Sequence, residues 1–167
     1  MANRLTPLLH KIISPLQGAF VSGRWIAENV ILAKEIVHYM NHKQGGSTVV
    51  RVKVDLMKAY DRLEWSFLLK VMECLGFSSK WCQLVHQCIT MVRFSVLVNG
   101  TPFGYIVSSR GIHQGGSLSS YLFILCTEVL SRLLLRKEAE GLLHGVMVRC
   151  KCLTVSYLMF ADDLLSF

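Results

Sequence analysis

The chain has 167 residues, of which 52% are hydrophobic and 17% are charged, so intrinsic disorder is excluded and one domain with a sizeable core is expected. Eighteen Lys and Arg residues against eleven Asp and Glu residues give a formal net charge of +7, which favours a polyanionic partner. The start of the chain does not look like a signal peptide, and its dense apolar runs are shorter than the roughly 18–20 residues of a membrane span. We therefore expect an intracellular protein, nuclear or cytoplasmic, that makes no membrane contact and keeps its cysteines reduced.

The first third of the chain is predicted to contain one helix and one strand. Residues 1–23 carry two of the three prolines and are expected to form an irregular connection with short helical pieces. Apolar residues spaced by three and four from Ile26 to Met40 predict an amphipathic helix, which the Gln-Gly-Gly-Ser segment at 44–47 ends. Alternating valines then predict a strand over 48–55, with Asp55 at its C-terminal end.

The remainder is predicted to contain three helices, a hairpin and two further strands, which gives an α+β fold with mostly antiparallel strands instead of alternating βαβ units. One helix begins near Trp65 and ends at Gly76, and the next begins at Ser78 or Ser79. The buried stripe of that second helix is predicted to be Trp81, Leu84, Val85 and Cys88. The later elements are expected to be a hairpin over 94–108 with its turn at Asn99–Gly100, a long helix over 119–140, and strands over 144–150 and 153–160.

Two adjacent carboxylates, Asp162 and Asp163, separate one apolar strand from another apolar stretch. Like charges in such a place repel each other, and partial burial raises the cost. A polar β-turn, in which Asp is common, is one explanation. A second is a metal site, because Asp55 also ends a strand and the two strand ends could converge. Carboxylate oxygens are the ligands that Mg²⁺ prefers.

Four segments resemble motifs of the reverse transcriptase domain of non-LTR retrotransposons, most closely the type abundant in plants. They are IISPLQGAFVSGR at 12–24, VDLMKAYDRLEW at 54–65, SRGIHQGGSLSSYLF at 109–123 and FADD at 160–163. Their order and spacing extend the resemblance over essentially the whole chain.

The resemblance implies an incomplete right-hand polymerase, in which an antiparallel palm sheet is backed by helices and accompanied by partial fingers, with no thumb. The chain would be a single partial domain, fingers-like over about 1–47 and palm-like over about 48–167. The implied reaction is RNA-directed DNA synthesis, in which a deoxynucleoside triphosphate reacts with the 3′-hydroxyl of a DNA primer on an RNA template. We expect this fragment to be inactive alone.

The resemblance also implies a two-metal site. Asp55 and Asp162 would hold two Mg²⁺ ions, for which Mn²⁺ could substitute, with Asp163 assisting and the Leu56 carbonyl as a backbone ligand. Asp61 is expected to cap the following helix instead of binding metal.

Substrate-binding positions follow from the same resemblance. Tyr60 would lie under the sugar and exclude a 2′-hydroxyl, and Gln114 and Gly115 would lie close to the nucleotide and the template strand. Arg24 would reach the triphosphate, although a solvated loop arginine is an equal alternative.

The second palm motif departs from the family pattern, because Gly116, Ser117 and Ser120 stand where an Asp and two prolines are usual. Glycine in place of proline loosens a loop, which puts nucleotide positioning in doubt. Two other interpretations therefore remain open: a catalytically dead remnant that binds nucleic acid, and an inert product of a degenerate retroelement.

Overall fold

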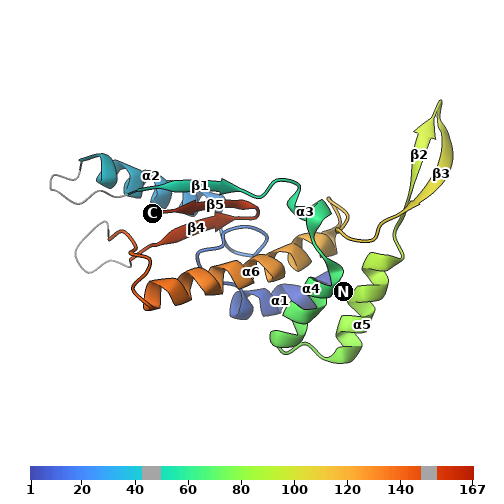
Figure 1. Cartoon of the computed structure of the whole chain (residues 1–167), viewed down its shortest axis with the longest axis horizontal. Coiled ribbons are helices and arrows are strands. Elements are labelled where there is room, and N and C mark those ends of the chain that lie inside the picture. Colours follow the sequence, from blue (N-terminus) through green and yellow to red (C-terminus); the bar gives the residue numbers. More distant parts are fainter. Residues whose placement is uncertain (43–49, 148–153) are drawn as a thin grey trace.

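The computed structural model describes residues 1–42, 50–147 and 154–167 (Figure 1). Its elements, in chain order, are α1 (Ala2–Ile12), α2 (Ile26–His42), β1 (Val52–Asp55), α3 (Ala59–Arg62), α4 (Trp65–Cys74), α5 (Ser79–Thr90), β2 (Arg93–Val98), β3 (Thr101–Val107), α6 (Ser117–Ala139), β4 (Tyr157–Phe160) and β5 (Asp163–Ser166). The predicted turn at 44–47 lies outside the described residues, as do the parts of the predicted strands within 43–49 and 148–153.

The central sheet has three antiparallel strands in the order β1-β5-β4. A two-residue turn joins β4 to β5, whereas β1 comes from the first half of the chain and pairs along β5 from Val52 to Asp55. The prediction of a mixed fold with antiparallel strands is confirmed. Among the described residues the strands are shorter than predicted, since β1 begins at Val52, β4 begins at Tyr157, and the described residues before β4 add only an isolated Val146–Val155 bridge.

The sheet lies between α2 and α6 (Figure 1). Successive side chains of a strand point to opposite faces, so Leu158 of β4 packs with Ile36 of α2 while the neighbouring Met159 packs with Leu130 and Leu134 of α6. Both faces of β4 are therefore buried, and its Tyr157, Leu158 and Met159 read as an unbroken apolar run.

Helix α6 joins this sheet to a second core formed with α1, α4 and α5. Its residues from Leu122 to Cys126 are all buried, and they share a cluster with Leu9 of α1, Leu68 of α4 and Val85 of α5. By length and composition alone α6 would suffice to cross a membrane, a test that the core helix of a soluble protein also passes. Its packing against α1 and α4 is that of a core helix.

The prediction of an irregular N-terminal segment with short helical pieces is wrong in part. Residues 13–23 are irregular, but α1 is a continuous helix of 11 residues that contains Pro7. Proline removes one hydrogen bond from a helix and is disfavoured in its interior. Leu5 and Leu9, one turn apart, are both fully buried, and this tertiary packing outweighs the local preference.

The predicted buried stripe of α5 is also wrong in part. The helix does begin after Ser78, whose side chain accepts a hydrogen bond from the Trp81 amide, but its buried residues are Cys82, Val85 and Ile89, and both Leu84 and Cys88 are exposed. The predicted and the observed sets of residues both have helical spacing, so spacing alone does not distinguish them. The packing of α5 against α4 determines which set faces the core.

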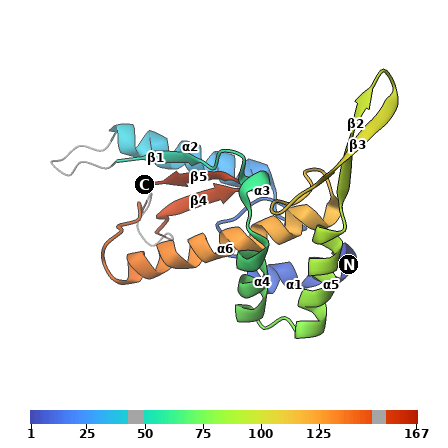
Figure 2. The same cartoon turned by 45° about the vertical axis from the view of Figure 1, so that its right-hand side comes forward.

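The predicted hairpin is confirmed as β2 and β3, and it projects away from the rest of the molecule (Figures 1 and 2). Asn99 and Gly100 both have positive φ, of 50° and 80°, which is the mark of a type I′ turn. At its base the Phe94 ring lies 5.7 Å from the His113 ring, centroid to centroid.

Cysteine reactivity offers a direct test of this core. Burial raises the pKa of Cys126 to about 12, and it also raises the pKa of Cys82, whereas Cys74 and Cys88 are exposed. In a protein with Cys150→Ser and Cys152→Ser, we expect a thiol-specific disulfide reagent at pH 8 to modify Cys74 and Cys88 within minutes. Cys82 and Cys126 should react only after unfolding. Rapid modification of Cys126 in the folded protein would contradict the packing of α6.

Candidate functional site

The turn between β4 and β5 presents the adjacent pair Asp162 and Asp163. Ala161 and Asp162 are its two central residues, since Phe160 and Asp163 are the last partners of the ladder. Ala161 adopts a left-handed conformation with φ of 54°, as type I′ and II′ hairpin turns require at their first central position. Ala161 is buried, Asp162 is half-buried and Asp163 is exposed.

Asp55 lies directly opposite Asp163 in the antiparallel pairing of β1 with β5. Opposite residues share one face of the sheet, with Cβ atoms about 4.5–5.5 Å apart. The Leu56 amide donates a hydrogen bond of 3.4 Å to the carbonyl oxygen of Asp162, which ties the end of β1 to the turn. The predicted convergence of the two strand ends is therefore present.

A lysine lies beside these carboxylates. Lys53 precedes Asp55 by two residues on the same face, and its Nζ is 3.2 Å from Asp163 Oδ1. Both side chains are more than half exposed, so the ion pair stabilises the fold little. Its effect is local, because it balances one negative charge at the strand end.

The donor set fits a hard divalent cation such as Mg²⁺. It comprises the carboxylates of Asp55, Asp162 and Asp163 and the backbone carbonyl of Leu56, all oxygen donors. Within the described ranges no three His, Cys, Asp or Glu side chains are clustered closely enough to hold a metal ion. Like-charged carboxylates repel when no cation lies between them. The side chains of Asp55, Asp162 and Asp163 are therefore expected to point apart when no metal ion is bound.

Tyr60 packs against the first half of α6. Its ring stacks on Phe123 with the centroids 4.5 Å apart and the planes 14° from parallel. Burial raises the pKa of Tyr60, a hydrogen bond with the Ser120 side chain lowers it, and the charge of Asp162 raises it. The net pKa is above the ordinary value, so the phenol is neutral at physiological pH.

Three hydrogen bonds tie the loop before α6 to the segment that runs from α3 to the start of α4. The amides of Gly111 and Ile112 donate to the carbonyls of Leu63 and Tyr60 at 2.8 and 3.0 Å, and Trp65 Nε1 donates to the Gly111 carbonyl at 2.6 Å. Gly111 has φ of +83°, and a Cβ there would lie 2.9 Å from the Asp61 carbonyl, so the close approach requires glycine.

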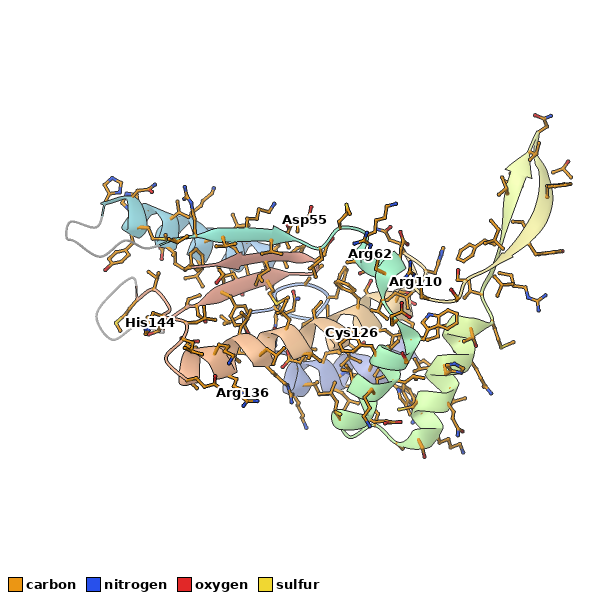
Figure 3. The ribbon with its side chains drawn as sticks, in the orientation of Figure 1. Asp55, Arg62, Arg110, Cys126, Arg136 and His144 are labelled. Carbon is orange, nitrogen blue, oxygen red and sulfur yellow. The ribbon has the colours of Figure 1, made fainter. Side chains whose placement is uncertain are left out.

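Gln114 and Gly115 are exposed in this same loop, and Gln114 lines a cavity of about 620 Å³ between the loop, α5 and the base of the hairpin. Asp61 also lines this cavity. The prediction that Asp61 caps the following helix is wrong, because Asp61 lies inside α3 and the N-cap of α4 is Glu64. Figure 3 shows Arg62 and Arg110 near α3, to the right of Asp55 in that view. Arg110 forms an ion pair with Glu64, in which its Nη1 lies 3.4 Å from the Glu64 Oε1.

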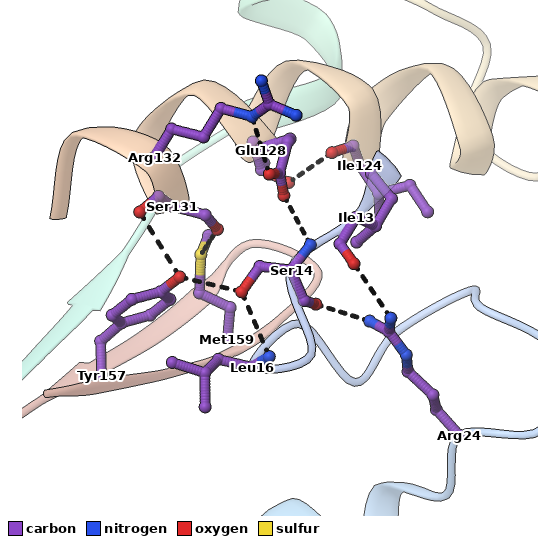
Figure 4. A network of polar contacts seen from close by, with 11 residues as sticks. Ile13, Ser14, Leu16, Arg24, Ile124, Glu128, Ser131, Arg132, Tyr157 and Met159 are labelled. Carbon is purple, nitrogen blue, oxygen red and sulfur yellow. Dashed lines mark hydrogen bonds and ion pairs between the residues drawn. The ribbon is translucent and has the colours of Figure 1, made fainter. Parts of the chain in front are cut away.

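Arg24 holds a loop through three backbone carbonyls. Its Nη1 donates to the Ser14 carbonyl at 2.6 Å and its Nη2 to the Ile13 carbonyl at 3.0 Å (Figure 4). Nη1 also donates to the Gln17 carbonyl at 2.6 Å. Burial lowers the pKa of Arg24, and the charge of Glu128 raises it. The guanidinium thus shapes residues 13–24, and its predicted contact with a triphosphate stays a prediction.

A buried carboxylate on α6 completes this network and was not predicted from the sequence. Glu128, 5% exposed, accepts a hydrogen bond of 2.8 Å from the Ser14 amide and pairs with Arg132 Nε at 3.0 Å (Figure 4). Ser14 Oγ in turn lies 3.1 Å from the Tyr157 hydroxyl on β4. A single acid inside the apolar half of a helix was the signal that could have identified Glu128.

The chain matches the family model described as "Reverse transcriptase (RNA-dependent DNA polymerase)" over residues 1–167. An uncharacterized mitochondrial protein of Arabidopsis thaliana is 49% identical over 67 residues, which are 40% of this chain and 55% of that protein. An uncharacterized 149 kDa protein of transposon TX1 from Xenopus laevis is 26% identical over 162 residues, which are 97% of this chain and 12% of that protein. The chain thus covers less than two thirds of either relative.

The fold is similar to that of a solved telomerase. A structure of telomerase from Candida albicans, in complex with a fragment of telomeric RNA, superposes with a TM-score of 0.62 at 16% sequence identity. The match covers 98% of this chain and 29% of the telomerase chain. At this identity the likeness establishes the fold alone.

Proposed function

Since the chain belongs to the reverse transcriptase family, in the branch of the non-LTR retrotransposons, we propose that it carries the nucleotidyl-transfer centre of an RNA-directed DNA polymerase. The observation that carries this proposal is the placement of Asp55 directly opposite Asp163, beside the turn that presents Asp162. By analogy with the family, the palm would comprise the sheet and its surroundings, residues 48–167 approximately. Residues 1–47, approximately, would form part of the fingers. The proposed location is intracellular.

Each residue of the site would have a separate part. Asp55 and Asp162 would hold two Mg²⁺ ions, with Asp163 and the Leu56 carbonyl assisting. When bound, the ions lower the pKa of the primer 3′-hydroxyl and stabilise charge on the α-phosphate of the incoming nucleotide. Lys53 keeps the charge of Asp163 balanced, and Tyr60, fixed on Phe123, would place its ring under the sugar.

The proposed substrates are an RNA template, a DNA primer and deoxynucleoside triphosphates. The net charge of +7 supports attraction of a nucleic acid, and the telomerase of similar fold is described in complex with an RNA. Gln114 and Gly115, exposed in the loop before α6, are the proposed contacts to the nucleotide and the template strand.

The proposal is tested by single-nucleotide incorporation into a DNA primer annealed to RNA, with Mg²⁺ and the next complementary deoxynucleotide. The sequence alone led us to expect an inactive fragment, but because Asp55 lies opposite Asp163 we now expect weak incorporation of a single nucleotide. We expect no processive synthesis, since the transposon relatives carry the matched segment as part of much longer chains. Incorporation no greater than that of an Asp162→Asn control, by folded protein that binds the duplex, would contradict the proposal. It would favour a remnant that only binds nucleic acid, whose affinity falls steeply with salt.

Sugar selection by Tyr60 gives a second prediction. Tyr60→Ala should raise incorporation of ribonucleotides relative to deoxynucleotides by about 10- to 100-fold, the discrimination that steric exclusion of a small group supplies. The measurement is the ratio of kcat/KM values for the two nucleotides. Tyr60→Phe is the matched control, because it keeps the ring on Phe123 and loses only the hydroxyl. An unchanged ratio in Tyr60→Ala would exclude this role.

A further inference from the structure

The side chain of Gln17 is bound to the backbone of the turn that carries Asp162. Gln17 is 1% exposed, and its Oε1 accepts hydrogen bonds of 3.0 Å from the amides of Ala161 and Ala19. Its Nε2 donates to the Ala161 carbonyl at 3.4 Å. One carboxamide thus satisfies both backbone groups of Ala161, the residue immediately before Asp162.

Ala161 needs such a partner for two reasons. Its φ of 54° is a conformation that a residue with a Cβ adopts only under constraint from its surroundings. Ala161 is also 7% exposed, so water gives its amide and carbonyl little compensation, and a buried backbone group without a partner is unfavourable. The Gln17 carboxamide compensates both buried backbone groups and holds the residue in its positive-φ conformation, and no residue of the sheet supplies these two hydrogen bonds.

The backbone of Gln17 and of its two neighbours is itself held in place by hydrogen bonds. Its carbonyl accepts from Arg24 Nη1 at 2.6 Å. On either side of it, the Leu16 carbonyl accepts from the Met159 amide and the Gly18 amide donates to the Met159 carbonyl, both at 2.9 Å. The loop therefore runs beside β4 as a short parallel bridge at Gln17 and Met159. This anchorage fixes where the Gln17 side chain can reach.

We propose that Gln17 is a positioning residue that sets the conformation of the Ala161–Asp162 turn and so aims the Asp162 carboxylate at the divalent cation. This inference rests on the proposed function, since it assumes that Asp162 is a metal ligand. It adds a residue outside the three palm motifs. Arg24 acts one step further away, by holding the carbonyl of Gln17.

The test compares Mn²⁺ binding to the folded protein, followed by electron paramagnetic resonance of the free ion. In Gln17→Met, which keeps the length of the side chain and loses both hydrogen bonds, we expect the dissociation constant for Mn²⁺ to rise about tenfold, as for other partners that orient a metal ligand. The matched control is Asn29→Leu. Asn29 Nδ2 donates to the Met159 carbonyl at 3.0 Å, so this change removes a carboxamide contact to the same strand without touching the turn.

Amide hydrogen exchange supplies a readout that does not depend on metal. In protein labelled with ¹⁵N-alanine, the Ala161 amide should be protected in the wild type and in Asn29→Leu, and should exchange at least about tenfold faster in Gln17→Met. If Gln17→Met does not fold, Gln17→Asn, whose shorter side chain cannot span to Ala161, carries the same expectations.

The possible outcomes distinguish a failure of the role of Gln17 from a failure of the proposed function. Equal Mn²⁺ affinity of wild type and Gln17→Met, or an unprotected Ala161 amide in the wild type, would overturn the inference and leave the proposed function standing. Absence of Mn²⁺ binding by a folded wild type would overturn the proposed function itself. A rise in the dissociation constant for Asn29→Leu equal to that for Gln17→Met would assign the effect to general loosening of β4, and the positioning role would fall.

Discussion

Replacing Asp162 by Asn is expected to weaken Mn²⁺ or Mg²⁺ binding by about 100-fold or more, beyond the typical effect of an outer-shell change. Asn keeps the shape of the side chain and one oxygen donor but removes the negative charge. A cation bound at the proposed site, among three carboxylates and a backbone carbonyl, would depend on that charge. Nucleotide incorporation should fall by about 1,000-fold, roughly 4 kcal/mol of barrier, because in the proposed mechanism the metal would supply the charge stabilisation in the transition state.

The measurement combines metal titration with single-nucleotide incorporation, and Asp61→Asn is the control. Asp61 belongs to the same motif as Asp55, yet it lies inside α3 and lines the cavity near the hairpin. We expect Asp61→Asn to retain metal binding and Asp55→Asn to lose it as Asp162→Asn does. If Asp61→Asn and Asp162→Asn lose metal binding to the same extent, the site is not at the strand ends.

Replacing Glu128 by Ala should destabilise the protein by roughly 3 kcal/mol, near the lower end of the range for a broken buried ion pair. The lower end applies because Arg132 is 58% exposed and regains water when its partner is lost. The Ser14 amide, by contrast, becomes a buried donor without an acceptor. Arg24 also loses the negative charge that raises its pKa.

Urea unfolding at neutral pH measures this loss. Glu140→Ala is the control, because Glu140 pairs with Arg136 at 2.8 Å and Lys137 at 2.7 Å on the surface of the same helix, and exposed pairs contribute little. We expect Glu140→Ala to unfold at the wild-type urea concentration. A Glu128→Ala protein as stable as Glu140→Ala would show that the Figure 4 network adds nothing to the fold.

The sequence predicted those parts of the molecule whose signals are local. Alternating valines and the Asn99–Gly100 turn predicted β1 and the hairpin, since each pattern depends on neighbours along the chain. The positions of Asp55 and Asp163 at strand ends followed in the same way. Their direct opposition depends on β1 pairing with β5, which the spacing suggested but could not establish.

The rest depends on contacts between distant segments. The buried face of α5 is chosen by α4, and Pro7 is tolerated in α1 because Leu5 and Leu9 are buried. The hydrogen bonds of Gln17 to Ala161 join residues 144 positions apart, and a lone glutamine in a loop gives no sign of such a partner. The three carbonyl partners of Arg24 are likewise set by the fold of the loop, so the sequence alone did not reveal them.

The separation of Gln17 from Ala161 also fixes when the turn can form during synthesis. The loop leaves the ribosome well before the turn, and its carboxamide has no turn to bind until 144 further residues have been added. Contacts between such distant residues close slowly, because the chain entropy of a long loop opposes them. The Asp162 turn should therefore reach its final geometry only after α6 and the α1–α4–α5 core have already packed.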